Sequence, residues 1–166
     1  MQAQLREPTI ADAPAVSALV QACFGQFVSA DWEPEAQQYF LAQSTPERFA
    51  SLIPEAAFSA VAELEGQLVG MILLAQPNTL SFLFVDAAMH KRGIARRLWE
   101  AARSHIEVAY PAVRTIELNA SPHAVGAYKA LGFYPISEPF RRAGSVATRM
   151  ACWLPGRALR NSGPSA

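Results

Sequence analysis

The chain has 166 residues and a mass of 18.0 kDa, with 51% apolar and 17% charged residues. This length supports one globular domain with its own core, and the composition excludes disordered and fibrous classes. Its 14 basic and 14 acidic residues leave no net charge, so we expect no nucleic-acid partner.

Two cysteines, Cys23 and Cys152, lie far apart without a Cys-x-x-Cys spacing or a nearby histidine pair. They predict buried thiols, no metal site and no disulfide scaffold. The first residues lack the basic start and apolar run of a signal peptide, and no apolar stretch approaches the ~20 residues of a membrane span. We therefore expect a cytoplasmic protein with no membrane partner.

The first half of the chain predicts one strand, a helical region and three further strands. The capping box Thr9-x-x-Asp12 starts the first helix, whose apolar residues recur at helical spacing up to Phe24. Apolar runs rich in Val, Ile, Leu and Phe, separated by turn residues, favour strands after this region. The expected elements are a strand at 3–7, a helix from 9, one or two short helices within 31–53, and strands at 57–64, 68–75 and 79–85.

The second half alternates helical and strand patterns, with Ser121-Pro122 as a helix start and Gly132 as a helix end. The expected elements are a helix from 94 to before 110, a strand at 115–119, a helix at 122–131, and strands near 134–138 and 145–154. This order predicts an α/β (α+β) fold: a mixed, mainly antiparallel central sheet of about seven strands with helices on both faces. We expect one domain over residues 1–154 and a flexible tail over 155–166.

Residues 90–97, which read HKRGIARR, are the first candidate site. Five of these eight residues are Lys, Arg or His, and they stand where a strand gives way to a helix. Because a helix start carries a partial positive charge, Lys91 and Arg92 are unfavourable there unless an anion binds. Free backbone amides beside Gly93 suit phosphate oxygens, so the pattern predicts either a pyrophosphate-binding turn or a solvated basic helix face. Neither G-x-x-x-x-G-K-[ST] nor G-x-G-x-x-G occurs, which argues against nucleotide triphosphatases and dinucleotide-binding dehydrogenases.

Two segments together resemble motifs of the GCN5-related N-acetyltransferase (GNAT) family. Residues 90–95 read HKRGIA, where the family has Gln/Arg-x-x-Gly-x-Gly/Ala. Residues 121–133 read SPHAVGAYKALGF, where the family has Asn-x-x-Ala-x-x-x-Tyr-x-x-x-Gly-Phe. The expected order of elements also agrees with that family over residues 3–154. The resemblance implies the acyl-CoA N-acyltransferase fold, acetyl-CoA as co-substrate and no metal.

The same resemblance implies an enzyme that transfers the acetyl group of acetyl-CoA directly to an amine of a small molecule or peptide. Tyr128 would act as the catalytic acid that donates a proton to the departing thiolate. The residues implied to bind the co-substrate are Phe84, Val85, His90, Lys91, Arg92, Gly93, Ile94, Ala95, Arg96, Asn119, Ser121, Ala124 and Tyr128. Among them, His90 and Ser121 depart from the family pattern without removing a backbone amide.

The resemblance identifies no general base, because residues 79–85 contain no carboxylate and Asp86 only follows them. Glu117 is the best catalytic candidate, since strand alternation places it on the same side as Asn119. A solvent-facing glutamate is the other interpretation, and His123 acting through water is a further candidate. A core tyrosine at position 128, a CoA-binding sensor without turnover and a homodimer remain open alternatives.

Overall fold

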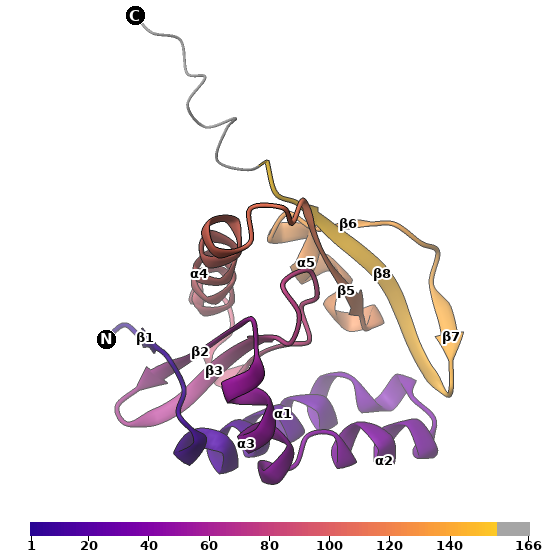
Figure 1. The fold of residues 1–166 in the computed structure, drawn as a ribbon. Helices are drawn as coiled ribbons and strands as arrows, with labels where there is room; N and C mark the ends of the chain where they lie inside the picture. Colours follow the sequence, from indigo (N-terminus) through magenta and orange to yellow (C-terminus); the bar gives the residue numbers. More distant parts are fainter. Residues whose placement is uncertain (156–166) are drawn as a thin grey trace, which may run out of the picture.

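The computed structural model describes residues 1–155, and Figure 1 shows strands lying between α4 and the helices α1 to α3. In this part of the chain the strands are β1 (Gln4–Arg6), β2 (Phe58–Leu64), β3 (Gln67–Leu74), β4 (Phe82–Val85), β5 (Thr115–Ala120), β6 (Tyr134–Pro135), β7 (Phe140–Arg142) and β8 (Ser145–Trp153). The α-helices are α1 (Ala13–Phe27), α2 (Pro34–Ala42), α3 (Pro46–Glu55), α4 (Ile94–Ala109) and α5 (Val125–Ala130). Short 3₁₀ helices are η1 (Ile10–Asp12), η2 (Ser29–Asp31), η3 (Ala87–Met89) and η4 (Pro122–Ala124). Apart from Pro155, the tail expected to be flexible lies outside the described residues.

The strands form two sheets that meet at one point. Antiparallel pairing orders one sheet β1-β2-β3-β4 and the other β5-β8-β6, with β7 also paired to β8. A parallel bridge between Thr79 and Glu117 joins them, and there the Glu117 N–H donates to Asn78 O at 2.9 Å while the Leu80 N–H donates to Glu117 O at 3.0 Å. Within the described chain β4 and β5 do not pair beyond this bridge, so a gap opens between them.

The predicted α/β fold, with a mixed, mainly antiparallel sheet and helices on both faces, is confirmed. One difference is that the strand expected at 79–85 begins only at Phe82, because residues 78–80 bond to the C-terminal sheet instead. Another is β7, which raises the number of described strands to eight. The turn between β7 and β8 contains two residues in left-handed backbone conformations, Ala143 and Gly144. Alanine seldom adopts this conformation, so the sequence does not predict the turn.

Two apolar clusters cover the two faces of the N-terminal sheet. On one face, Leu98 and Ile106 of α4 belong to a cluster that continues into β5 and β8. A close approach of α4 requires Gly70, because a Cβ there would lie 3.1 Å from Ile94 Cγ2 and 3.2 Å from Leu98 Cδ1. On the other face, α1 and α3 pack on β2 and β3, and this cluster of described residues includes none from β5, β6 or β8. One face of the C-terminal sheet is therefore left without a covering helix.

An ion-pair network ties β1 to the start of α1. Arg6 donates to both carboxylate oxygens of Asp12 at 2.9 Å, and its Nε donates to Glu63 Oε2 at 2.8 Å. Asp12 also accepts the Thr9 N–H at 2.8 Å, which completes the predicted capping box. The hydrogen bonds from Arg6 lower the pKa of Asp12 to about 2. Because this pKa lies below the ordinary value, the pair stabilises the fold above about pH 4, and this contribution is lost as the pH falls toward 2.

The variant Asp12→Ala is expected to lower the free energy of unfolding by about 1–2 kcal/mol at pH 7, through loss of the cap and of a partly exposed ion pair. The loss should shrink as the pH approaches 2, where the parent's carboxylate is itself protonated. Urea unfolding at a series of pH values measures both effects. Glu7→Ala, which changes an exposed carboxylate one residue from Arg6, is the control. An equal loss at every pH would contradict the ion-pair explanation.

Candidate functional site

The loop between β4 and α4 presents a row of unpartnered backbone amides. Lys91 and Gly93 both adopt left-handed conformations, with φ of 61° and 75°. Gly93 caps α4 and accepts the first helical hydrogen bond from the Arg97 N–H at 3.0 Å. Within residues 1–155, no acceptor contacts the amides from Lys91 to Arg96. Successive amides in such a turn at a helix start form a concave site for an anion.

The cations of this loop divide into two engaged and two available side chains. Arg96 Nη2 donates to Ala130 O at the end of α5 at 2.9 Å, and Arg97 Nη1 donates to Ala3 O at 2.6 Å. Lys91 and Arg92 are exposed and have no side-chain partner within residues 1–155. The loop therefore keeps two positive charges available beside its free amides.

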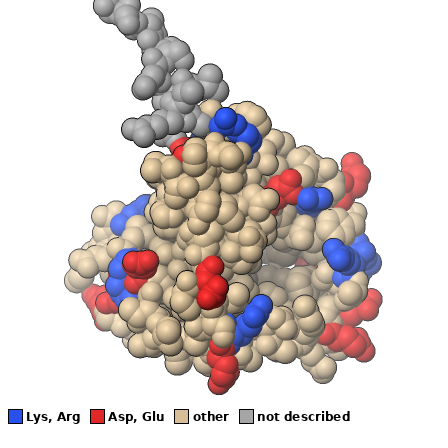
Figure 2. All heavy atoms as spheres, in the orientation of Figure 1, with Lys and Arg blue, Asp and Glu red and all other residues tan. Residues whose placement is uncertain are grey.

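The charged side chains on the face of the molecule that Figure 2 shows are dispersed. On the face in Figure 2, basic and acidic side chains are scattered without a continuous basic patch, and the surface is hollowed where the C-terminal sheet stands over α1 and α2. No helix of the described residues has the length and apolar character needed to cross a membrane. In the same part of the chain, no three His, Cys, Asp or Glu side chains gather as metal ligands. The basic loop is thus a local feature.

The free edge of β4 faces the gap between the sheets. The Asp86 N–H donates to Val69 O at 2.9 Å, so alternation directs the backbone groups of Phe84 to β3 and those of Val85 to the gap. His90 Nε2 lies 2.8 Å from Val85 O and donates to it, since a carbonyl oxygen only accepts. This contact holds the basic loop against the end of β4.

Phe27, the last residue of α1, lies between two imidazole rings. Its ring stacks on His90 at 5.1 Å and on His123 at 5.1 Å, measured between ring centroids. The end of α1, the loop before α4 and the start of α5 therefore meet beside the gap. His123 remains exposed, and its candidate role as a proton acceptor through water stays a prediction.

Tyr128 of α5 holds an unused proton donor. Its ring packs edge-on against Phe133 at 5.6 Å and belongs to the margin of the apolar cluster under α4. Burial raises the pKa of Tyr128 to about 12, so the phenol is protonated at any ordinary pH. No group among residues 1–155 hydrogen-bonds to the hydroxyl of this half-buried side chain, so the proton is available to a ligand.

Strand alternation on β5 is as expected: Ile116 and Leu118 are buried, while Glu117 and Asn119 lie on the uncovered face. Glu117 is not a free carboxylate. Its Oε2 accepts from Arg149 Nε at 2.9 Å and also from Arg149 Nη2. No motif points to Arg149, although a lone charge inside the apolar run of β8 was a signal that could have drawn attention to it.

A short 3₁₀ helix, η4, connects β5 to α5. Ser121 caps η4, and its carbonyl accepts the Ala124 N–H at 2.9 Å. The helix expected at 122–131 is thus a 3₁₀ turn followed by α5. Asn119 and Ser121 flank the gap from the β5 side, opposite the free edge of β4.

Both cysteines are buried and protonated. Cys23 Sγ donates to Val85 O at 3.5 Å, and burial raises the pKa of this thiol to about 11. Burial also raises the pKa of Cys152. Because the thiolate is the nucleophilic form, neither cysteine is suited to form a covalent acyl intermediate.

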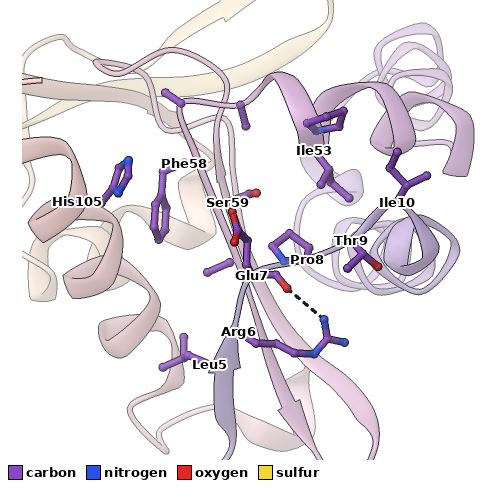
Figure 3. Close-up of a pocket in the computed structure, with 14 residues that line it drawn as sticks. Leu5, Arg6, Glu7, Pro8, Thr9, Ile10, Ile53, Phe58, Ser59 and His105 are labelled. Carbon is purple, nitrogen blue, oxygen red and sulfur yellow. Dashed lines mark hydrogen bonds between the residues drawn. The ribbon is translucent and has the colours of Figure 1, made fainter. Parts of the chain in front are cut away.

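A separate open groove of about 670 Å³ lies at the far edge of the N-terminal sheet (Figure 3). Its walls are the chain from Leu5 to Ile10, the end of α3, the start of β2 and His105, whose ring packs on Phe58 at 5.1 Å. None of the predicted site residues lines it. The candidate functional site is therefore the loop and gap described above, not this groove.

Comparisons with known proteins identify the fold and the family. A family model described as an acetyltransferase (GNAT) domain matches residues 28–154. The GCN5-related N-acetyltransferase from Rhodopseudomonas palustris superposes with a TM-score of 0.78 at 21% identity, covering 93% of this chain and 97% of that one. For the PaiA N-acetyltransferase of Thermoplasma acidophilum in complex with coenzyme A, the TM-score is 0.75 at 14% identity, with 92% and 99% covered.

An aminoglycoside 6′-N-acetyltransferase complexed with coenzyme A superposes with a TM-score of 0.67 at 16% identity, covering 93% of this chain and 98% of that one. No curated protein matches significantly. At these identities the solved structures establish the shared fold, while the family model spans most of the chain. The chain belongs to the GCN5-related N-acetyltransferase (GNAT) family.

Proposed function

We propose that the protein is an acetyl-CoA-dependent N-acetyltransferase that transfers the acetyl group directly to an amine of a small molecule or peptide. The observation that carries the proposal is the row of unpartnered amides from Lys91 to Arg96. Two of the similar structures are described as coenzyme A complexes, which supports the same ligand class here.

The amides from Arg92 to Arg96, those of Gly93, Ile94 and Ala95 included, hold the CoA diphosphate, and Lys91 and Arg92 add their charges. The Val85 N–H at the free edge of β4 orients the pantetheine arm, whereas the backbone of the predicted Phe84 pairs with β3 and Val85 O already accepts from His90 and Cys23. Asn119, Ser121 and Ala124 flank the arm from the other side of the gap. The available donors and the available cations both suit an anionic ligand. His90 braces the loop through Val85.

The proposed reaction has no covalent acyl-enzyme. The amine nitrogen attacks the thioester carbon, the C–S bond breaks, and the CoA thiolate takes the proton of Tyr128. An ammonium acceptor gives up one proton before attack and the nitrogen gives a second to solvent as the amide forms. Tyr128 is then reprotonated from solvent, so one proton is released overall. The unpartnered hydroxyl of Tyr128 supports this role, since nothing in residues 1–155 competes for its proton.

Glu117 is retained as the proposed base, acting on an ammonium group bound beside it. In the free protein its Oε2 is already engaged by two donors of Arg149. Glu117 acts as the base when a bound ligand draws some of the Arg149 hydrogen bonds away from its Oε2.

The test is equilibrium binding of CoA by calorimetry, together with acetyl transfer to a panel of amines followed as release of free thiol. CoA binding with turnover of any amine supports the proposal. CoA binding without turnover of any amine identifies a sensor, and absence of CoA binding rejects the assignment of the loop.

A further inference from the structure

In the Glu117–Arg149 ion pair, each side chain has one polar group that forms no hydrogen bond with the described residues. Arg149 donates through Nε and Nη2 to the same oxygen, Glu117 Oε2. Glu117 Oε1 and Arg149 Nη1 have no partner among the described residues. The side chains are 35% and 57% exposed on the face of the C-terminal sheet that no helix covers. A solute therefore has access to a carboxylate oxygen and a guanidinium donor side by side.

Backbone contacts hold both residues in place. Arg149 N–H donates to Ser137 Oγ at 3.0 Å, and Arg149 O accepts from the Ile136 N–H at 2.8 Å. Glu117 is held by its backbone hydrogen bonds to Asn78 and Leu80 at the junction of the two sheets. Since β4 and β5 separate just beyond this junction, the pair stands at the mouth of the gap proposed for the thioester. The two charges are thus preorganised where an acceptor must enter.

We propose that this pair binds a zwitterionic acceptor, an amine that carries a carboxylate nearby, as in a free α-amino acid. The inference rests on the proposed function and names its substrate class. The acceptor's carboxylate binds Arg149 at Nη1, and its ammonium binds Glu117 at Oε1. Adjacent charges of opposite sign complement a zwitterion, because each end meets its counter-charge.

The same contact frees the base. A carboxylate that draws Arg149 toward itself weakens the hold of Arg149 on Glu117, which then accepts one proton from the ammonium. The neutral nitrogen keeps its lone pair for attack on the thioester carbon. Glu117 leaves this step protonated and returns its proton to solvent after the product departs.

Purely cationic acceptors fit the pair less well, because they offer no acceptor oxygen to Arg149 Nη1. The carboxylate of Glu33 lies beside Gly144, far from the pair along β8. Glu33 N–H bonds to Gly144 O at the start of this hairpin strand, and Gly144 is five residues before Arg149, roughly 16 Å in an extended strand. That exceeds the Debye length of about 8 Å in physiological salt. Glu33 therefore supplies no second negative charge at the pair for a cationic acceptor.

The experiment compares free amino acids with the corresponding amino-acid amides, and with putrescine, as acceptors in the thiol-release assay. We expect free amino acids to exceed their amides at least tenfold in kcat/KM. Arg149→Gln is expected to lower kcat/KM for the amino acid 10- to 100-fold, mainly through KM, and to reduce the preference over the amide to near unity. Arg149→Lys should keep part of the preference, since it keeps the charge but not the planar donor set.

Three checks separate the outcomes. Arg114→Gln changes an exposed arginine that directly precedes β5, three residues before Glu117, and should behave as the parent. CoA affinity and thermal unfolding of each variant show whether Arg149→Gln remains folded.

Turnover of amides or putrescine as fast as amino acids would overturn the zwitterion inference but leave the proposed acetyltransferase activity intact. Absence of turnover with every amine, and of amino-acid binding to the CoA complex by calorimetry, would overturn both.

Discussion

Tyr128→Phe is expected to lower kcat for acetyl transfer about 100-fold while leaving the Kd for CoA nearly unchanged. The variant removes only the hydroxyl, so the apolar contact with Phe133 is kept. Thiol release at saturating substrates measures kcat, and calorimetry measures the Kd. Because the hydroxyl has no partner among residues 1–155, its removal should not lower the stability of the fold.

The pH dependence adds a second measurement. With a pKa of about 12, Tyr128 stays protonated through pH 10, so the ratio of parent to variant rates should be constant between pH 7 and 10. Tyr110→Phe, at the end of α4, is the matched control and should behave as the parent. Equal kcat for both variants and the parent would show that Tyr128 is only a packing residue.

The double variant Lys91→Glu with Arg92→Glu is expected to raise the Kd for CoA about 100-fold, or roughly 2.7 kcal/mol. Each reversal removes an attraction for the diphosphate and adds a repulsion, and neither residue has a side-chain partner in residues 1–155 whose loss would unfold the loop. The effect should diminish as salt is added. Calorimetric titration over a range of salt concentrations measures it.

Arg48→Glu, a single reversal of an exposed charge on α3 that changes the net charge half as much as the double variant, is the control for a charge change away from the loop. Its Kd for CoA should stay close to that of the parent. A double variant that binds CoA as tightly as the parent would show that the basic loop is a solvated helix face.

Much of the fold follows from patterns within short segments. The capping box at Thr9 and Asp12, the helical stripe that includes Leu98 and the alternation around Glu117 each depend on residues a few positions apart. Their structures are therefore encoded locally. The extent of β4 was missed because residues 78–80 pair with a strand nearly forty residues away. β7 was missed because its turn places an alanine in a left-handed conformation.

The spacing within residues 90–95 and 121–133 is enough to identify the family, because each motif lies on one continuous segment whose local geometry follows from that spacing. The surroundings of Glu117, in contrast, depend on how distant strands pair. Its partner Arg149 is 32 residues away, and their contact depends on the register between β5 and β8, which places Asn119 opposite Arg149 and Glu117 on the diagonal. Register is set by the packing of whole strands, so no local pattern contains it.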